Sequence, residues 1–142
     1  MNDCVFCKIV RGELPAAKVF ENENLLAFLD VGPVSRGHTL VIPKRHYENI
    51  LEIPSDQLSA LTSHLPILGR AIVKATGSDG FSLVQLNGEC SGQVVMHLHF
   101  HIIPRSSGDG VKFDWPKGGR YMDGEGETLA AAIVEEMGCH GG

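Results

Sequence analysis

The chain has 142 residues and a formal net charge of −5, with 43% hydrophobic and 20% charged residues. These values are ordinary for one soluble globular domain, and the acidic balance argues against general nucleic-acid binding, which needs basic patches. No stretch approaches the roughly 20 apolar residues of a membrane-spanning helix, and the N-terminus lacks the pattern of a secretory signal. We therefore expect a cytoplasmic protein with reduced cysteines and no membrane partner.

The first half of the chain is predicted to contain a short helix and three strands. Residues 4–10 are expected to form the helix, which stops before Gly12 and Pro15. Apolar runs bounded by turn-forming residues predict strands over residues 17–22, 24–30 and 38–43. The segment 44–53 is expected to form a second short helix.

The second half begins with a helical pattern. One apolar stripe, with Ser55 as the predicted N-cap and Gly77 as the C-cap, consists of Leu58, Leu61, Leu65, Leu68 and Ile72. Pro66 should kink or split this helix. Strands are predicted over 81–86 and 94–104, and a C-terminal helix over 126–138.

These elements predict the α+β class, with a five-stranded, mainly antiparallel sheet, a long helix and shorter helices at both termini. Residues 1–107, with all five predicted strands, are expected to form one domain. Residues 108–142 are expected to be a C-terminal extension of that same domain.

Three of the seven histidines stand at alternate positions of one apolar segment, "MHLHFHIIPR", at His97, His99 and His101. Because side chains alternate along a strand, the three imidazoles should share one face, while the hydrophobes between them face the core. Three interpretations are open. The histidines can be solvated without a role, they can bind a metal, or they can catalyse nucleophilic attack at phosphorus.

The metal interpretation has further candidate ligands elsewhere in the chain. Cys4 and Cys7 form a C-x-x-C pair, and His46 adds an imidazole. Two thiolates and two imidazoles are a tetrahedral set that zinc accepts. The three triad histidines and these residues offer six candidates for four positions, so a metal would use part of the triad only. His38, at the start of a strand, is interpreted as structural.

The triad resembles the signature of the histidine triad (HIT) family of nucleotide hydrolases and transferases. "HTLVIPK" at the expected distance and the segment from Cys4 to His46 resemble the bacterial HIT-like branch with an N-terminal C-x-x-C. The likeness runs from about Cys4 to Arg105. It implies cleavage at the α-phosphate of a purine nucleotide conjugate, which can be a dinucleoside polyphosphate, a nucleotide ester or a phosphoramidate. It also implies that residues 1–107 are the nucleotide-binding and catalytic domain. Trp115 or the terminal helix is expected either to cover the leaving-group side of that site or to pack on the domain.

The resemblance also implies individual roles. His99 is expected to attack phosphorus and form a nucleotidyl-histidine intermediate, and His101 to contact the phosphate oxygens. Asp30 corresponds to the residue that binds the ribose hydroxyls. The remaining nucleotide-binding residues are implied to be an apolar base slot of Phe6, Ile9, Leu14, Phe28 and Val31, and a phosphate-side loop with Asn87, Gly92 and Gln93. Backbone amides of residues 91–93 are candidates to bind phosphate oxygens.

For the metal, the family implies a structural zinc held by Cys4, Cys7, His46 and His97, and for assembly it implies a homodimer that joins two sheets. One residue departs from the pattern. Val94 stands where many nucleotide phosphoramidases have serine or threonine, so efficient release of nitrogen leaving groups is in doubt. Two alternatives remain: a metalloenzyme that uses the triad as ligands, and a nucleotide-binding module without catalysis.

Overall fold

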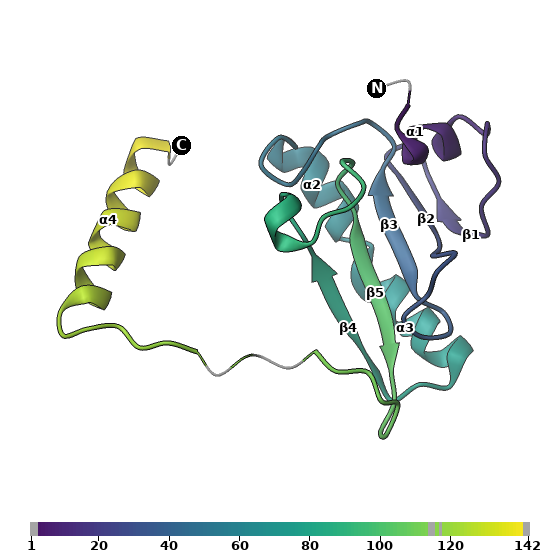
Figure 1. Ribbon diagram of the computed structural model, residues 1–142. Coiled ribbons are helices and arrows are strands. Elements are labelled where there is room, and N and C mark those ends of the chain that lie inside the picture. Colours follow the sequence, from purple (N-terminus) through teal and green to yellow (C-terminus); the bar gives the residue numbers. More distant parts are fainter. Residues whose placement is uncertain (1–2, 114–115, 117, 141–142) are drawn as a thin grey trace. The chain divides into compact units, whose positions relative to one another are not determined.

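The computed structural model describes residues 3–113, 116 and 118–140, and the chain divides into two compact units, Met1–Val111 and Lys112–Gly142 (Figure 1). The first unit carries the whole sheet, and the second contains helix α4 (Glu125–His140). The helix predicted over 126–138 is thus confirmed. Among the described residues, no helix is long and apolar enough to cross a membrane.

The first unit is built on one antiparallel sheet of five strands in the order β1-β2-β3-β5-β4. The strands are β1 (Lys18–Glu21), β2 (Leu25–Leu29), β3 (Thr39–Pro43), β4 (Gly80–Gln85) and β5 (Phe100–Arg105). The α+β prediction with a five-stranded antiparallel sheet is therefore confirmed. Strands β1 and β4 form the two edges.

Each face of the central strands packs on a different layer, as Figure 1 shows. Helices α2 (Ser55–Thr62) and α3 (Leu65–Thr76) cover one face, where Leu98, Phe100 and Ile102 are at most 7% exposed. The short helix α1 (Val5–Val10) packs on Leu26, Phe28, Leu40 and Ile42 of the other face. Because β2 and β3 are covered on both sides, they are apolar apart from Thr39 at the start of β3.

The long apolar stripe is divided at the proline that the sequence singled out. α2 ends at Thr62, α3 begins at Leu65, and Pro66 occupies the first turn of α3, where its missing N–H costs nothing. Gly77 caps α3 with φ of 69°, as predicted. The N-cap prediction was wrong by one residue: Pro54 precedes α2, and no side chain caps it.

Two other boundaries differ from the prediction. Residues 44–53 form turns instead of a helix, because their backbone groups bond to distant elements. The Tyr47 carbonyl accepts from the Leu98 N–H at 2.7 Å, and the Ile50 N–H donates to Asn87 Oδ1 at 2.9 Å. The last strand begins at Phe100 instead of residue 94. His97 and His99 therefore lie just before the strand and not inside it.

Candidate functional site

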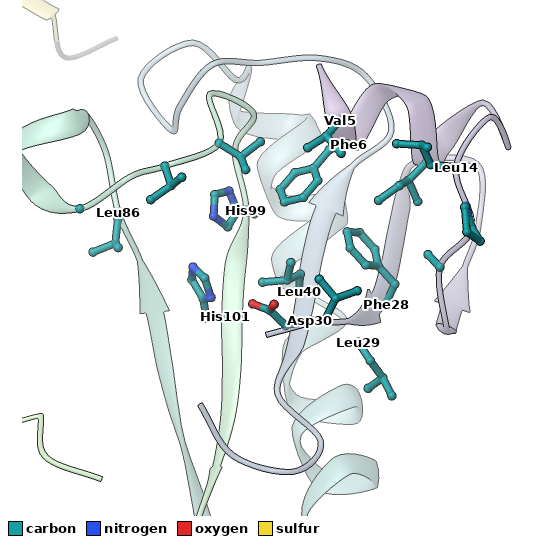
Figure 2. Close-up of a pocket in the computed structure, with 17 residues that line it drawn as sticks. Val5, Phe6, Leu14, Phe28, Leu29, Asp30, Leu40, Leu86, His99 and His101 are labelled. Carbon is teal, nitrogen blue, oxygen red and sulfur yellow. The ribbon is translucent and has the colours of Figure 1, made fainter. Parts of the chain in front are cut away.

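A cavity of about 540 Å³ opens on the α1 side of the sheet, next to the triad (Figure 2). Figure 2 shows His99 and His101 between Leu86 on one side and the aromatic rings of Phe6 and Phe28 on the other. The predicted site residues that line it are Phe6, Ile9, Leu14, Phe28, Asp30, Val31, Gly92, His99 and His101. Sequence reasoning missed other lining residues, among them Leu40, Leu86 and Val95.

His99 is held in one tautomer by the backbone. Its Nδ1 lies 2.7 Å from the carbonyl oxygen of His97, which can only accept, so Nδ1 carries the proton. The neutral ring then has its lone pair on Nε2. The side chain is 7% exposed and lines the cavity. A buried, neutral imidazole with a fixed lone pair is prepared for nucleophilic attack.

His101 is oriented through a second chain of hydrogen bonds. The Val34 N–H donates to His38 Nδ1 at 3.0 Å, so His38 carries its proton on Nε2. His38 Nε2 lies 2.9 Å from His101 Nδ1 and donates to it. His101 therefore carries its own proton on Nε2 and presents a donor. His38 is 3% exposed. The sequence analysis interpreted it as structural, but it also orients His101, a residue of the cavity lining.

All four histidines of this region favour the neutral form. Burial lowers the pKa of His99 and of His38 below the ordinary value. Burial, with the neighbouring His99 and His38, lowers the pKa of His101 to about 4, and burial also lowers the pKa of His97 to about 4. At neutral pH, His99 is thus a free base and His101 a neutral donor.

Asp30 ends the apolar part of the cavity with a carboxylate. Its Oδ1 accepts from the Gly32 N–H at 2.9 Å, and its Oδ2 lies 3.6 Å from His38 Nε2. On the other side of the cavity floor, the Phe6 and Phe28 rings meet edge to face with centroids 5.5 Å apart. The cavity thus combines an apolar slot for a flat ring with a carboxylate that accepts hydrogen bonds.

Asn87 and Gln93 do not line the cavity. Asn87 Nδ2 donates to Gln85 Oε1, and its Oδ1 accepts from the Ile50 N–H. Gln93, 2% exposed, donates to the Glu48 carbonyl and accepts from the Gly88 N–H. Both side-chain amides therefore fix the loop before β5 to residues 48–50. They position this wall of the cavity without contacting its interior.

The loop amides proposed for phosphate are used within the loop. The Ser91 and Gln93 N–H groups donate to the Gly88 carbonyl, and the Gly92 N–H donates to Glu89, at 3.0–3.3 Å. In the described part of the chain, the next two amides, of Val94 and Val95, have no acceptor, and both residues line the cavity. These amides replace residues 91–93 as the candidate phosphate donors.

No lysine or arginine lines the cavity among the residues that the structure describes. Lys44 pairs with Glu21 at 2.7 Å, and Arg105 pairs with Asp109 at 2.9 Å. The positive charges of Lys44 and Arg105 are thus engaged with carboxylates, and neither residue lines the cavity. The cavity offers donors for one phosphate group and little charge for more.

Cys4, Cys7, His46 and His97 meet next to the cavity, and their ligand atoms all lie within 4.8 Å of one another. The His97 Nδ1 atom is 3.4 Å from Cys4 Sγ, 3.6 Å from Cys7 Sγ and 3.2 Å from His46 Nδ1. The ligand atoms of a tetrahedral zinc ion with two sulphurs and two nitrogens are about 3.3–3.8 Å apart, as follows from Zn–S and Zn–N bond lengths. The His97 Nε2–H donates to the Pro43 carbonyl, which leaves Nδ1 free to bind. These four residues can form a metal site.

The HIT domain model matches residues 11–108. The Protein hit of Bacillus subtilis is 48% identical over 138 residues, which are 95% of this chain and 94% of that protein. An adenylylsulfatase of Arabidopsis thaliana is 52% identical over 108 residues, 76% of this chain, and the chain spans only 55% of that relative. An adenosine 5'-monophosphoramidase of Schizosaccharomyces pombe is 40% identical over 114 residues, 80% of this chain and 83% of that protein.

Solved structures are similar over nearly the whole chain. A protein of Streptococcus mutans superposes with a TM-score of 0.91 at 42% identity, covering 96% of this chain and 87% of that one. A zinc-bound histidine triad family protein of Mycobacterium smegmatis gives a TM-score of 0.75 at 33% identity, covering 97% and 98%.

Proposed function

The chain belongs to the HIT family, and from that premise we propose that it is a nucleotidyl hydrolase or transferase. It cleaves a purine nucleotide conjugate at the α-phosphate through a nucleotidyl-histidine intermediate on His99. The observation that carries the proposal is the hydrogen bond from His99 Nδ1–H to the His97 carbonyl, which leaves a lone pair on Nε2 at the cavity. Relatives named for cleavage of adenylyl sulfate and of adenosine phosphoramidate support this reaction class.

The reaction takes two displacements at phosphorus. His99 Nε2 forms a bond to the α-phosphorus, while the bond to the leaving group breaks and its electron pair goes to that group, which takes a proton from solvent. Water then attacks phosphorus, the N–P bond returns its electron pair to Nε2, and the water releases a proton. The His97 carbonyl stabilises the positive charge that the His99 ring gains in between.

The other lining residues bind the nucleotide. The His101 Nε2–H and the amides of Val94 and Val95 donate to the phosphate oxygens. Asp30 accepts from the ribose hydroxyls, and Phe6 and Phe28 enclose the base. Leu14 and Val31, at the rim, extend the slot. Gly92 lines the phosphate side, and Asn87 and Gln93 hold the loop that forms that side.

The charge of the cavity disfavours substrates with a highly charged leaving group. Attack at the α-phosphate of a dinucleoside polyphosphate releases a nucleoside polyphosphate, whose several negative charges need nearby cations. Because no lysine or arginine of the described chain lines the cavity, we favour nucleotide esters and phosphoramidates over polyphosphates.

The four-ligand cluster is proposed to hold zinc. Two thiolates and two imidazoles fill a closed tetrahedral shell, so the ion is structural and supplies local cross-linking of the fold. A zinc-bound relative supports this. Reduced thiols at Cys4 and Cys7 also support a cytoplasmic location, and we propose a homodimer as the assembled form.

The test is turnover across a panel of adenosine and guanosine phosphoramidates, esters and dinucleoside polyphosphates. His99→Ala should lower turnover at least about a thousandfold, because it removes the nucleophile. His64→Ala, in the turn between α2 and α3 and outside the cavity lining, is the matched histidine control and should keep full activity. Rapid mixing with an activated nucleotide ester should give a burst and a covalent nucleotidyl adduct.

The two alternatives make different predictions in the same experiment. If the triad bound a catalytic metal, His99→Ala would lose the metal while His97→Ala retained it, which would contradict the proposal. If the protein only bound nucleotides, the burst and the adduct would both be missing with every substrate of the panel.

A further inference from the structure

Helix α1 contributes to two sites at once. Its N-cap residue Cys4 and its residue Cys7 belong to the four-ligand cluster. Between and beside them, Val5, Phe6 and Ile9 line the nucleotide cavity. The cluster and the base slot therefore share one six-residue helix, and whatever fixes this helix fixes one wall of the slot.

Helix α1 is joined to the sheet and its loops by hydrogen bonds at the cluster. Among the described residues, the side-chain hydrogen bonds that leave the helix and its N-cap for the sheet or its loops run from the Cys4 and Cys7 sulphur atoms to His46 and His97. A helix of six residues is not stable by itself, since helix nucleation is costly. Apart from apolar packing, the cluster is thus the device that holds α1 on the sheet.

Phe6 connects the cluster with the catalytic and base-binding groups. Its ring centroid lies 5.8 Å from that of the ligand His97, 5.2 Å from that of the nucleophile His99 and 5.5 Å from that of Phe28. All three contacts are edge to face, with interplanar angles of 70–88°. At 6% exposure the ring has little room, so its position follows that of α1.

We propose that the four-ligand cluster and the nucleotide slot are energetically coupled through Phe6, so that metal and nucleotide bind cooperatively. Zinc on Cys4, Cys7, His46 and His97 orders α1, and the ordered helix sets the Phe6 wall against which the base packs. A nucleotide in the slot holds the same helix and thereby strengthens metal binding. The inference rests on the proposed function, because it takes the cavity to be a nucleotide site.

Binding measurements test the coupling without turnover. The dissociation constant of AMP is measured by calorimetry on the zinc-loaded and on the metal-free full chain. We expect AMP to bind at least about tenfold more weakly without zinc, within the usual range of coupling between sites. Reciprocity requires that saturating AMP lower the zinc dissociation constant by the same factor, measured by competition with a chelator.

Variants separate Phe6 from general stabilisation of the fold. Phe6→Leu keeps an apolar side chain but loses the ring, and we expect the coupling factor to fall towards one while zinc still binds. Cys7→Ser should weaken both zinc and AMP binding, whereas Cys90→Ser, an exposed thiol outside the cluster, should change neither. Hydrogen exchange should show that zinc removal exposes the α1 amides while the amides of β2 and β3 stay protected.

The outcomes are distinct. Equal AMP affinity with and without stoichiometric zinc would overturn the coupling and leave the proposed function intact. An undiminished coupling factor in Phe6→Leu would overturn the path through Phe6. If the metal-free chain unfolds, AMP tightens zinc binding through folding alone, and the comparison of this effect between Phe6→Leu and the unmodified chain then decides. No AMP binding to the zinc-loaded protein would refute the nucleotide site itself, and the coupling with it.

Discussion

The three triad histidines are chemically divided by their hydrogen-bond partners. His97 presents Nδ1 to two thiolates, His99 presents a lone pair, and His101 presents a donor, each because its other ring nitrogen is engaged. The alternate spacing predicts that they lie together, and the C-x-x-C predicts a partner for one of them. The contact between His38 and His101 could not be predicted, because the sequence does not show that β3 lies beside β5. In the sheet, Leu40 of β3 stands opposite His101.

His38 is a positioning residue that can be tested. His38→Ala removes the donor to His101 Nδ1, so His101 can adopt the other tautomer, and kcat should fall about tenfold with little change in KM. His38→Gln, whose amide reaches a similar position, should restore most of kcat. His38 helps to lower the pKa of His101, so its loss should also raise that pKa.

The role of His38 can also be tested through the pH dependence of kcat/KM. Protonation of His101, with its pKa of about 4, breaks the hydrogen bond that its Nδ1 accepts from His38, and protonation of His99, whose pKa is lowered by burial, removes the nucleophilic lone pair. In the unmodified protein, kcat/KM should therefore decline only below the ordinary histidine pKa of about 6.5. In His38→Ala that acid limb should move to higher pH. An unmoved limb, with zinc content constant across the pH range, would mean that His38 serves the fold alone.

Val94 is the second residue with a specific expectation. It is 87% exposed at the cavity, where a hydroxyl could protonate a departing amine. Val94→Ser should raise phosphoramidate turnover about tenfold and leave the turnover of an activated aryl ester unchanged, since a phenolate leaving group departs without a proton. Both substrates are measured on the same preparations. Equal changes for the two would show that Val94 has no part in leaving-group choice.

The elements could be predicted where their own residues decide them. The stripe of α2 and α3, the break at Pro66 and the cap at Gly77 follow from local rules, and all are present. The segment 44–53 could not be predicted, because its backbone is engaged by Leu98 and Asn87 from other parts of the chain. The same contacts fix the loop before β5, which lines the cavity. Prediction from local sequence is therefore wrong for a segment beside the site.

A substitution at Gly37 tests how tightly the loop before β3 packs against α3 and β5. It has φ of +94°, and an added Cβ would lie 2.5 Å from Thr76 Cγ2 and 3.3 Å from Pro104 Cγ. Gly37→Ala should destabilise the protein by about 3 kcal/mol, combining backbone strain with overpacking, as measured by urea unfolding. Gly12→Ala, with φ of +77° and an open surrounding, should cost only about 1 kcal/mol. Equal losses would show that backbone strain accounts for both.

At the scale of the whole molecule, the sheet of the first unit ends in an apolar edge. Strand β4 has one neighbour, β5, and its side chains Phe81 and Leu83 are 40% and 48% exposed. Ile67 of α3 is 60% exposed. An edge strand with unpaired backbone groups and apolar side chains tends to pair with another chain. A second copy can add its own β4 across a two-fold axis and extend the sheet, which is the homodimer that the family resemblance implies.

Sedimentation equilibrium should therefore give the mass of a dimer for the full chain. Leu83→Lys places a charge on the β4 edge, where pairing would bury it, and should produce monomers. Leu51→Lys, at a position 86% exposed in a turn, introduces the same charge away from that edge and should remain dimeric. If both variants stay dimeric, the contact between copies lies elsewhere on the molecule. If the unmodified protein were a monomer at micromolar concentration, β4 would be an unpaired edge strand. Phe81 and Leu83 would then remain exposed to water, as single apolar side chains on protein surfaces often are.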